Sequence, residues 1–352
     1  MRKLVTLQII KDVQPIEGAD FIEYVSFEDI DWKCVALKGE FKKGDQAIYF
    51  EIDSFLPIEP EFEFLRKSSY KKMGTKEGFR LKTIKLKGHI SQGLALPLNK
   101  LEKFIKGKKL EEGVDLSSIF NVTKYEPPIE IKMGKKVRTF PSFIQRTDQE
   151  RIQTFYKKIK KIAQELNIKL EDIEFEESLK LDGMSMTVYA TEDKIGVCSR
   201  NQEIEDKHST LWKVAKKQKI IDTLISLREK GYSLAFQGEL LGPKIQGNRE
   251  GLTDYSFFLF DIFDIKKGRK LTVNEKEELL KKENIDIQQC PVYRKVKIFK
   301  EFDNVEDLLL HAEGKSLNNN VREGLVYKSC ELINGEQLSF KVISNKFLLK
   351  EK

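Results

Sequence analysis

The sequence predicts an α+β protein in which a small N-terminal β-barrel precedes a larger domain of mixed strands and helices. The chain has 352 residues, which is long for one domain and suits two, since domains usually hold roughly 100–200 residues. Short β-rich runs bounded by turn residues fill the first part of the chain. Later strands and helices do not alternate regularly, as a doubly wound sheet would require. We therefore expect domains over residues 1–120 and 140–352, joined by a linker over 121–139.

Composition excludes several classes of protein. Hydrophobic residues make up 40% and charged residues 34% of the chain, which fits a folded globular protein rather than a disordered one. No run approaches the ~18 apolar residues of a membrane span, and the N-terminus lacks a signal-peptide core. The four cysteines are far apart without a CxxC pair, and the three histidines are scattered, so a zinc cage is excluded and a reducing compartment is favoured. We expect a cytoplasmic protein without a membrane partner.

The N-terminal segment predicts a barrel of the OB type. Residues 4–10, 33–37 and 47–52 are β-rich runs. Residues 80–87 alternate apolar and cationic side chains, which predicts a strand with its cations on one face. Closely spaced strands with one basic face are typical of OB folds that bind nucleic acid. A small β-barrel without a ligand is the alternative.

Positive charge is concentrated in this segment. Residues 65–109 hold fourteen Lys and Arg but only two Glu, an excess of twelve positive charges, whereas the whole chain carries +7. Such a cluster is expected of a protein that binds a polyanion. A solvated lysine-rich face would give the same pattern.

Later elements follow from turn, cap and periodicity signals. Proline-containing stretches at 125–128 and 140–142 bracket the linker, and Thr147–Glu150 has the pattern of a capping box that begins a helix. An apolar stripe from Ile152 to Leu166 supports that helix. Further helices are expected over 211–228 and from Asn304 to Gly314. Strands are expected over 186–190, 233–240, 257–265, 324–329 and 338–343.

Six short motifs carry the functional interpretation. Lys180-Leu181-Asp182-Gly183 alone is a weak signal, because a surface turn gives the same string. It is followed in order by strings at 199–201, 238–240, 257–262, 323–328 and 339–341, namely Ser-Arg-Asn, Gly-Glu-Leu, Phe-Phe-Leu-Phe-Asp-Ile, Glu-Gly-Leu-Val-Tyr-Lys and Ser-Phe-Lys. Each string is common, but the complete ordered set is not expected by chance.

This succession resembles the nucleotidyl motifs of the covalent nucleotidyltransferases, the polynucleotide ligases and mRNA capping enzymes. The segments 32–35, 42–45, 49–57 and 90–94 look like the N-terminal OB domain of the fifth family of ATP-dependent RNA ligases, and 140–148 resembles the start of their catalytic domain. The resemblance covers nearly the whole chain. It implies an OB-fold nucleic-acid-binding domain followed by a mixed α+β adenylyltransferase (ATP-grasp-like ligase) domain.

The resemblance also implies roles for single residues. Lys180 would be the nucleophile that carries AMP, while Asp182, Glu239 and Glu323 would hold Mg²⁺ or Mn²⁺ through water. The remaining assignments are adenine contacts by Phe260 and Val326 with Phe258 in reserve, a nucleic-acid phosphate contact by Arg200, and nucleotide phosphate contacts by Lys328 and Lys341. Many ligases carry a Lys-x-Lys pair in the last motif, whereas this chain has Ser339-Phe340-Lys341.

These roles agree with the chemistry of the residues. A lysine attacks phosphorus only as the neutral amine, and its ordinary pKa is about three units too high at neutral pH. A divalent cation on carboxylate oxygens would favour the neutral form. Asn334-Gly335 predicts a two-residue hairpin that pairs Ile333 with Glu336 and, by counting back, Lys328 with Lys341. Two lysines directly opposite each other would need an anion between them.

The sequence therefore predicts an ATP-dependent RNA ligase, expected to be a monomer. It would join the 3′-OH and 5′-phosphate ends of RNA through a lysyl-AMP intermediate and an AMP-capped 5′ end. By resemblance, the substrate is a nicked duplex of RNA or RNA and DNA. Three alternatives stay open at this point: a DNA nick ligase, a GTP-using capping-type guanylyltransferase, and an RNA-binding protein with an inactive transferase domain.

Overall fold

The computed structural model describes residues 2–126, 131, 134 and 136–350, so Pro127 and Pro128 of the expected linker lie outside the described residues. Two compact units emerge. The first comprises residues 1–128, 150–165 and 348–352, and the second comprises 129–149 and 166–347. The predicted domains are continuous segments of the chain, whereas each of these units combines separate segments, so the domain boundaries stay a prediction. None of the helices within the described part of the chain has the length and hydropathy needed to cross a bilayer.

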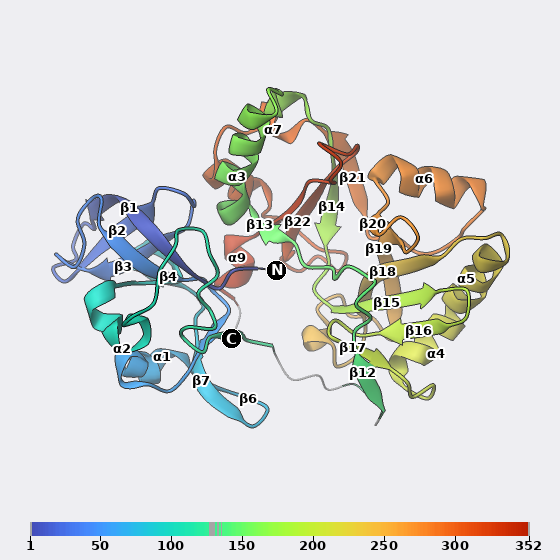
Figure 1. Ribbon diagram of the computed structural model, residues 1–352, viewed down its shortest axis with the longest axis horizontal. Helices are drawn as coiled ribbons and strands as arrows, with labels where there is room; N and C mark the ends of the chain where they lie inside the picture. Colours follow the sequence, from blue (N-terminus) through green and yellow to red (C-terminus); the bar gives the residue numbers. More distant parts are fainter. Residues whose placement is uncertain (1, 127–130, 132–133, 135, 351–352) are drawn as a thin grey trace. The chain divides into compact units, whose positions relative to one another are not determined.

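The first unit is built around a strongly bent sheet with the strand order β10-β4-β1-β2-β3 (Figure 1). Strand β1 pairs with β4 through its first half and with β2 through its second half, and its register shifts between Ile10 and Asp12. Such an irregularity bends a strand, which lets one strand serve two sides of a barrel. Strand β3 contacts β10 and β9, so the sheet is nearly closed. The bounds are β1 Val5–Pro15, β2 Ile22–Phe27, β3 Lys33–Leu37, β4 Gln46–Phe50 and β10 Leu94–Pro97.

Smaller elements complete this unit. They are β5 Ser54–Leu56, η1 Pro60–Leu65, α1 Arg66–Ser69, β6 Tyr70–Met73, β7 Lys76–Arg80, β8 Thr83–Leu86, β9 His89–Gln92, η2 Leu98–Leu101, α2 Glu102–Ile105, β11 Thr123–Lys124, β13 Glu150–Arg151 and α3 Ile152–Glu165. The strand expected over 80–87 is wrong, because β7 and β8 belong to different sheets and Arg80 is buried. The apolar stripe of α3 is confirmed, since Ile152, Phe155 and Ile159 are buried.

The predicted capping box is also wrong. Helix α3 begins at Ile152, two residues after Glu150. The Thr147 hydroxyl instead forms a hydrogen bond with the Ser185 hydroxyl at 3.0 Å, and Asp148 pairs with Arg200. Side chains that have other partners cannot cap a helix, so the four-residue pattern misplaces the helix start.

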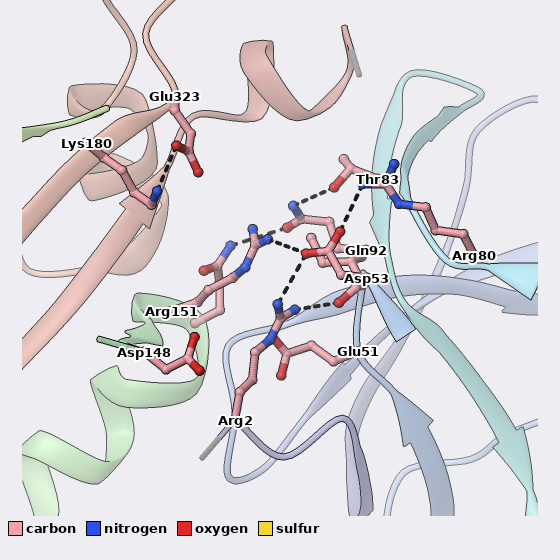
Figure 2. A network of polar contacts seen from close by, with 12 residues as sticks. Arg2, Glu51, Asp53, Arg80, Thr83, Gln92, Asp148, Arg151, Lys180 and Glu323 are labelled. Atoms are coloured by element: carbon pink, nitrogen blue, oxygen red, sulfur yellow. Dashed lines mark hydrogen bonds and ion pairs between the residues drawn. The ribbon is translucent and has the colours of Figure 1, made fainter. Parts of the chain in front are cut away.

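A cluster of buried charges joins the start of α3 to the barrel (Figure 2). Asp53 accepts hydrogen bonds from Arg2 at 3.2 Å, Arg80 at 3.1 Å and Arg151 at 2.9 Å, and Glu51 accepts one from Arg2 at 2.7 Å. Burial raises the pKa of Asp53, but Arg151, Arg2 and Arg80 outweigh it and hold that pKa well below its usual range. Asp53 is therefore the common anchor of three guanidinium groups.

The second unit contains two sheets. The larger has the order β12-β17-β16-β15-β18-β19-β20, and the smaller contains the run β23-β22-β14-β21. Their bounds are β12 Val137–Thr139, β14 Phe175–Lys180, β15 Met184–Ala190, β16 Ile195–Cys198, β17 Gln202–Ile204, β18 Leu234–Leu241, β19 Ser256–Asp264, β20 Arg269–Lys270, β21 Val292–Val296, β22 Gly324–Ser329 and β23 Ser339–Ile343. All five strands expected for this part of the chain are confirmed. Leu179 and Leu181 pack on Leu241 and Phe258, which brings the two sheets together.

Helices cover the larger sheet and flank the smaller one. Helices α4 and α5 lie beside β15 and β16 (Figure 1). The single helix expected over 211–228 is wrong, because Lys219 adopts a left-handed backbone with φ 56° and divides it into α4 and α5. The helix expected at Asn304 is confirmed as α8, whose Asp307 N–H donates to the Asn304 side chain. The bounds are η3 Leu170–Asp172, α4 Thr210–Lys217, α5 Ile220–Glu229, η4 Gln246–Asn248, α6 Val273–Lys282, α7 Ile298–Glu301, α8 Val305–His311 and α9 Asn345–Leu348.

The Asp53 cluster gives a stability prediction. Asp53→Asn leaves three largely buried guanidinium groups with Glu51 as the remaining carboxylate, so we expect a loss of about 3 kcal/mol in unfolding free energy, within the range for a broken buried ion pair. Urea denaturation followed by tryptophan fluorescence measures it. Asp20→Asn, at an exposed position of the same unit, is the matched control. A change for Asp53→Asn no larger than that of the control would contradict the anchor role.

Candidate active site

Lys180 and Glu323 form the centre of the site (Figure 2). Lys180 is the last residue of β14 and lies opposite Gly324, the first residue of β22. Glu323 precedes that glycine, and its Oε2 accepts a hydrogen bond from the Lys180 Nζ at 2.8 Å. A Cβ on Gly324 would lie 2.0 Å from the carbonyl oxygen of Val342, so only glycine lets β22 and β23 approach this closely. Strand pairing thus sets the Lys180–Glu323 contact.

Two further carboxylates surround Lys180. Glu239 lies on β18 between β15 and β19, and its Oε1 accepts a hydrogen bond from the Gly183 N–H at 3.1 Å. Asp182 follows β14, and its Oδ2 pairs with the Nε of Arg249 at 2.8 Å. The structure therefore brings together Lys180, Asp182, Glu239 and Glu323, of which the first and last are 143 residues apart in the sequence.

The crowded carboxylates shift one another's pKa. Burial and the Glu323 carboxylate raise the pKa of Asp182 to about 8, and burial is the main cause that raises the pKa of Glu239 to about 7. Burial lowers the pKa of Lys180, but Glu323 and Glu239 outweigh it, so the net shift is upward. These carboxylates therefore favour the ammonium form of Lys180, whereas attack on phosphorus needs the neutral amine.

The carboxylates have the donor chemistry of a magnesium or manganese site. Hard divalent cations take oxygen ligands and keep several waters. Within the described ranges, no group of three or more His, Cys, Asp or Glu side chains is arranged as a direct ligand set. Besides burial, repulsion from Glu323 raises the pKa of both Asp182 and Glu239, and a hydrated cation would relieve that repulsion. The residues therefore fit a cation held through water, and the metal role stays a prediction.

A bulge positions Phe260, the expected adenine contact. Along β18 and β19, Gln237 pairs with Asp261 and Gly238 with Leu259, so Phe260 is the extra residue between them. Bulges re-aim side chains, and Phe260 is partly exposed while Phe258, the reserve choice, is buried in the apolar cluster. Val326 is also partly exposed, from the neighbouring sheet. Phe260 and Val326 remain available to a ligand, and Phe258 does not.

The predicted register of the last hairpin is wrong. Ile333 does pair with Glu336, but β22 and β23 pair Val326 with Lys341 and Lys328 with Ser339. Four residues separate Lys328 from Ile333, whereas two separate Glu336 from Ser339, so the strand before the turn carries two extra residues. One of them, Cys330, donates its N–H to the Glu174 carbonyl instead of to the hairpin partner. The two lysines are therefore not opposite each other.

Lys328 has a buried carboxylate partner. Its ammonium group donates to Asp261 and, at 2.7 Å, to the Phe260 carbonyl, and it lies 5.3 Å from the Phe260 ring centroid. Asp261 also accepts a hydrogen bond from Lys270 at 2.6 Å. Burial raises the pKa of Asp261, but Lys270 and Lys328 lower it well below its usual range. The side chain of Lys328 thus supports the bulge that presents Phe260.

The remaining predicted residues are placed as follows. Arg200 lies at the turn between β16 and β17 and pairs with Asp148. Lys341 lies on β23 and is partly exposed. Sequence analysis did not single out Arg249 or Lys270, since neither belongs to a motif. Asp261 lies inside the motif at 257–262. Because a buried lysine needs a carboxylate partner, burial of Lys328 on β22 would have pointed to such a partner.

The fold and the site define a ligase-type protein, with a barrel of OB topology and a mixed α+β domain that presents a lysine among carboxylates. Family models agree, since an OB-fold domain matches residues 4–98 and RNA ligase matches residues 173–343. A comparison with curated protein sequences gives no match.

The structure of Naegleria gruberi RNA ligase with pyrophosphate is 39% identical, covers 99% of each chain and has a TM-score of 0.86. An alanine variant of that enzyme with ATP and Mn is 38% identical, covers 99% of this chain and 98% of that one, and has a TM-score of 0.86. Another variant, with AMP and Mn, has the same identity and TM-score and covers 99% of each chain. The chain belongs to the RNA ligase family.

The Lys180–Glu323 pair gives a prediction for the lysine pKa. Glu323→Gln removes the carboxylate that most strongly favours the ammonium form, so the pKa of Lys180 falls. The pH dependence of Lys180 acylation, followed by mass spectrometry of the peptide that contains it, measures the shift. Glu301→Gln, on an exposed helix away from Lys180, is the control. An unchanged midpoint for Glu323→Gln would refute the electrostatic reading of this pair.

Proposed function

We propose that this RNA ligase is ATP-dependent and joins RNA ends through a covalent lysyl-AMP intermediate on Lys180. The observation that carries the proposal is the position of Lys180, at a strand end among Asp182, Glu239 and Glu323. The similarity to the Naegleria enzyme, solved with ATP and Mn, with AMP and Mn, and with pyrophosphate, supports this choice of nucleotide and metal.

Asp182, Glu239 and Glu323 would hold a hydrated Mg²⁺ or Mn²⁺. When bound, the cation supplies positive charge that favours the neutral form of Lys180 and stabilises charge on the α-phosphate. Glu323 has a second task, because its hydrogen bond sets the position of the Lys180 amine at 2.8 Å. Gly183 fixes Glu239 through its backbone N–H.

The reaction consists of three phosphoryl transfers. The neutral Lys180 amine attacks the α-phosphorus of ATP, so an N–P bond forms, pyrophosphate leaves and a proton passes to solvent. An oxygen of the RNA 5′-phosphate then attacks the same phosphorus, which returns Lys180 as the leaving group. Finally, the 3′-OH attacks the 5′-phosphorus, loses its proton and expels AMP. Positioning and electrostatics supply the catalysis.

The residues around Lys180 are assigned to two groups, those that bind the nucleotide and those that bind the RNA ends. We assign Phe260 and Val326 to opposite sides of adenine, since both are partly exposed on facing strands. Lys341 is assigned to the nucleotide phosphates and Arg200 to the phosphate at the RNA ends. Lys328 acts on the nucleotide through Phe260, because its ammonium group is held by Asp261 and the Phe260 carbonyl.

The substrate is proposed to be a nicked duplex with RNA at the 3′-OH side, bound by a monomer in the cytoplasm. The basic segment 65–109 of the first unit supports a polyanion partner. Among its cations, Lys85 and Lys87 are exposed on and beside the short strand β8. We assign them to contacts with the flanking phosphate backbone, which do not read sequence.

Covalent labelling tests the chemistry of the first step. With α-labelled ATP and Mn²⁺ we expect covalent labelling of the protein, which Lys180→Ala abolishes. The label should be lost more readily in acid than in base, as expected for a phosphoramidate. Lys346→Ala, an exposed lysine paired with Glu313, is the control that keeps the label. Labelling by GTP in place of ATP, or persistence of the label in Lys180→Ala, would refute the proposal.

A panel of nicked duplexes tests the substrate. We expect sealing when the 3′-OH strand ends in RNA, and at least tenfold slower sealing when it ends in DNA. Gel analysis of end-labelled strands measures both the product and the AMP-capped intermediate. Equal rates on RNA and DNA ends would contradict the RNA preference, and sealing of free single strands at the same rate would contradict the nicked-duplex preference.

A further inference from the structure

A strained loop after β18 carries Arg249 to the active site. Within residues 242–251, three residues other than glycine have left-handed backbone, namely Lys244 at φ 65°, Gln246 at φ 44° and Asn248 at φ 48°. Such conformations are costly for residues with a Cβ and persist where the surrounding structure enforces them. The loop is therefore a held conformation rather than the relaxed state of this sequence.

Several hydrogen bonds enforce it. The Asn248 side chain bonds to Leu252 in both directions, donating to its carbonyl at 2.9 Å and accepting from its N–H at 3.1 Å. The segment before β22 holds the other side, since the Asn318 N–H donates to Glu250 at 3.0 Å and the Asn320 amide donates to the Arg249 carbonyl. The backbone of Arg249 is thus fixed from two directions, and the freedom that remains is in its side chain.

That side chain bridges two groups. The Arg249 Nε lies 2.8 Å from the Asp182 Oδ2, and the guanidinium carbon lies 4.4 Å from the centroid of the Phe347 ring. One-third of the Arg249 side chain is exposed, at 33%, against 18% for Asp182. Lys180 pairs with Glu323, while Arg249 pairs with Asp182 and opposes the rise in the Asp182 pKa that burial and Glu323 cause.

We propose that Arg249 is a stand-in cation, which occupies Asp182 in the nucleotide-free protein and gives up that oxygen when the hydrated divalent cation binds. This inference rests on the metal role of Asp182 proposed above. A guanidinium group and a divalent ion repel each other at the short distance that sharing one carboxylate requires. Since the loop backbone is fixed, release needs only a side-chain rotation, and the Phe347 ring face stays available to the guanidinium group.

The consequence is competition between Arg249 and the metal. Asp182 keeps a cationic partner before ATP arrives, so it does not stand as an unpaired charge next to Glu323. Metal binding in the absence of nucleotide is then weaker than three clustered carboxylates alone would give. ATP brings its own bound metal and more negative charge, which favours the exchange at the time when Lys180 must lose its proton.

Binding of Mn²⁺ to the nucleotide-free chain tests this directly, by electron paramagnetic resonance of the free ion. We expect Arg249→Gln to bind Mn²⁺ about fivefold more tightly than the unsubstituted chain, the size expected for a lost, partly exposed ion pair. Arg249→Lys keeps the charge and should stay within about twofold of the unsubstituted chain. Asp182→Asn defines the background from other surface carboxylates, and thermal denaturation checks that each variant is folded.

The possible outcomes separate this inference from the proposed function. Equal or weaker Mn²⁺ binding by Arg249→Gln overturns the stand-in role, as does Arg249→Lys binding as tightly as Arg249→Gln. If the unsubstituted chain, Arg249→Gln and Asp182→Asn all bind Mn²⁺ alike, then the metal role of Asp182 fails as well. Labelling of Lys180 by ATP would still stand or fall by its own experiment.

Discussion

The proposed chemistry of this site meets one electrostatic constraint: Lys180, which must be neutral to attack phosphorus, lies among three carboxylates that favour its ammonium form. Glu323 and Glu239 outweigh the effect of burial on Lys180. Under the proposed mechanism, the contact that positions the amine also favours its ammonium form, which does not attack phosphorus. In the proposed mechanism, a bound cation would offset the preference of Lys180 for the ammonium form, while the hydrogen bond to Glu323 would still position the amine. Binding of a metal-bearing nucleotide and activation of the nucleophile would then be one event.

Backbone irregularities, more than regular strands, deliver the groups to this point. At the β18–β19 bulge, Phe260 stays partly exposed although it packs against the apolar cluster that buries Phe258. Gly238 and Gly324 permit close approaches that any Cβ would block, at 2.4 Å and 2.0 Å respectively. The strained loop after β18 holds Arg249 beside Asp182. Regular pairing supplies a stable frame, and these departures from it serve residues at the site.

The sequence predicted the strands of the second unit and the motif residues around Lys180, because periodicity and ordered strings are local properties of a chain. It failed where the outcome depends on a distant partner. The hairpin register differs by two residues from the prediction, since Cys330 donates its N–H to the carbonyl of Glu174, the residue before β14, and not to the hairpin partner. The capping box failed because Thr147 and Asp148 have partners at Ser185 and Arg200. Arg249 meets Asp182 only through a loop that no pattern marks.

Two charge clusters in the second unit differ in their balance of positive and negative charge. By that difference we interpret the cluster around Asp261 as structural and the cluster around Lys180 as reactive. Around Asp261, two lysines face one carboxylate, and the pKa of Asp261 is held low, so every group stays in its ordinary charged form. Around Lys180, three carboxylates face Lys180 and Arg249, and the pKa values of Asp182 and Glu239 rise instead. The first cluster is satisfied by its own residues. The second has more carboxylates than cations, and under the proposed mechanism it would have still less positive charge once Lys180 gives up its proton. A cluster with that deficit gains stability from a bound cation, which makes the site responsive to its cofactor rather than merely tolerant of it.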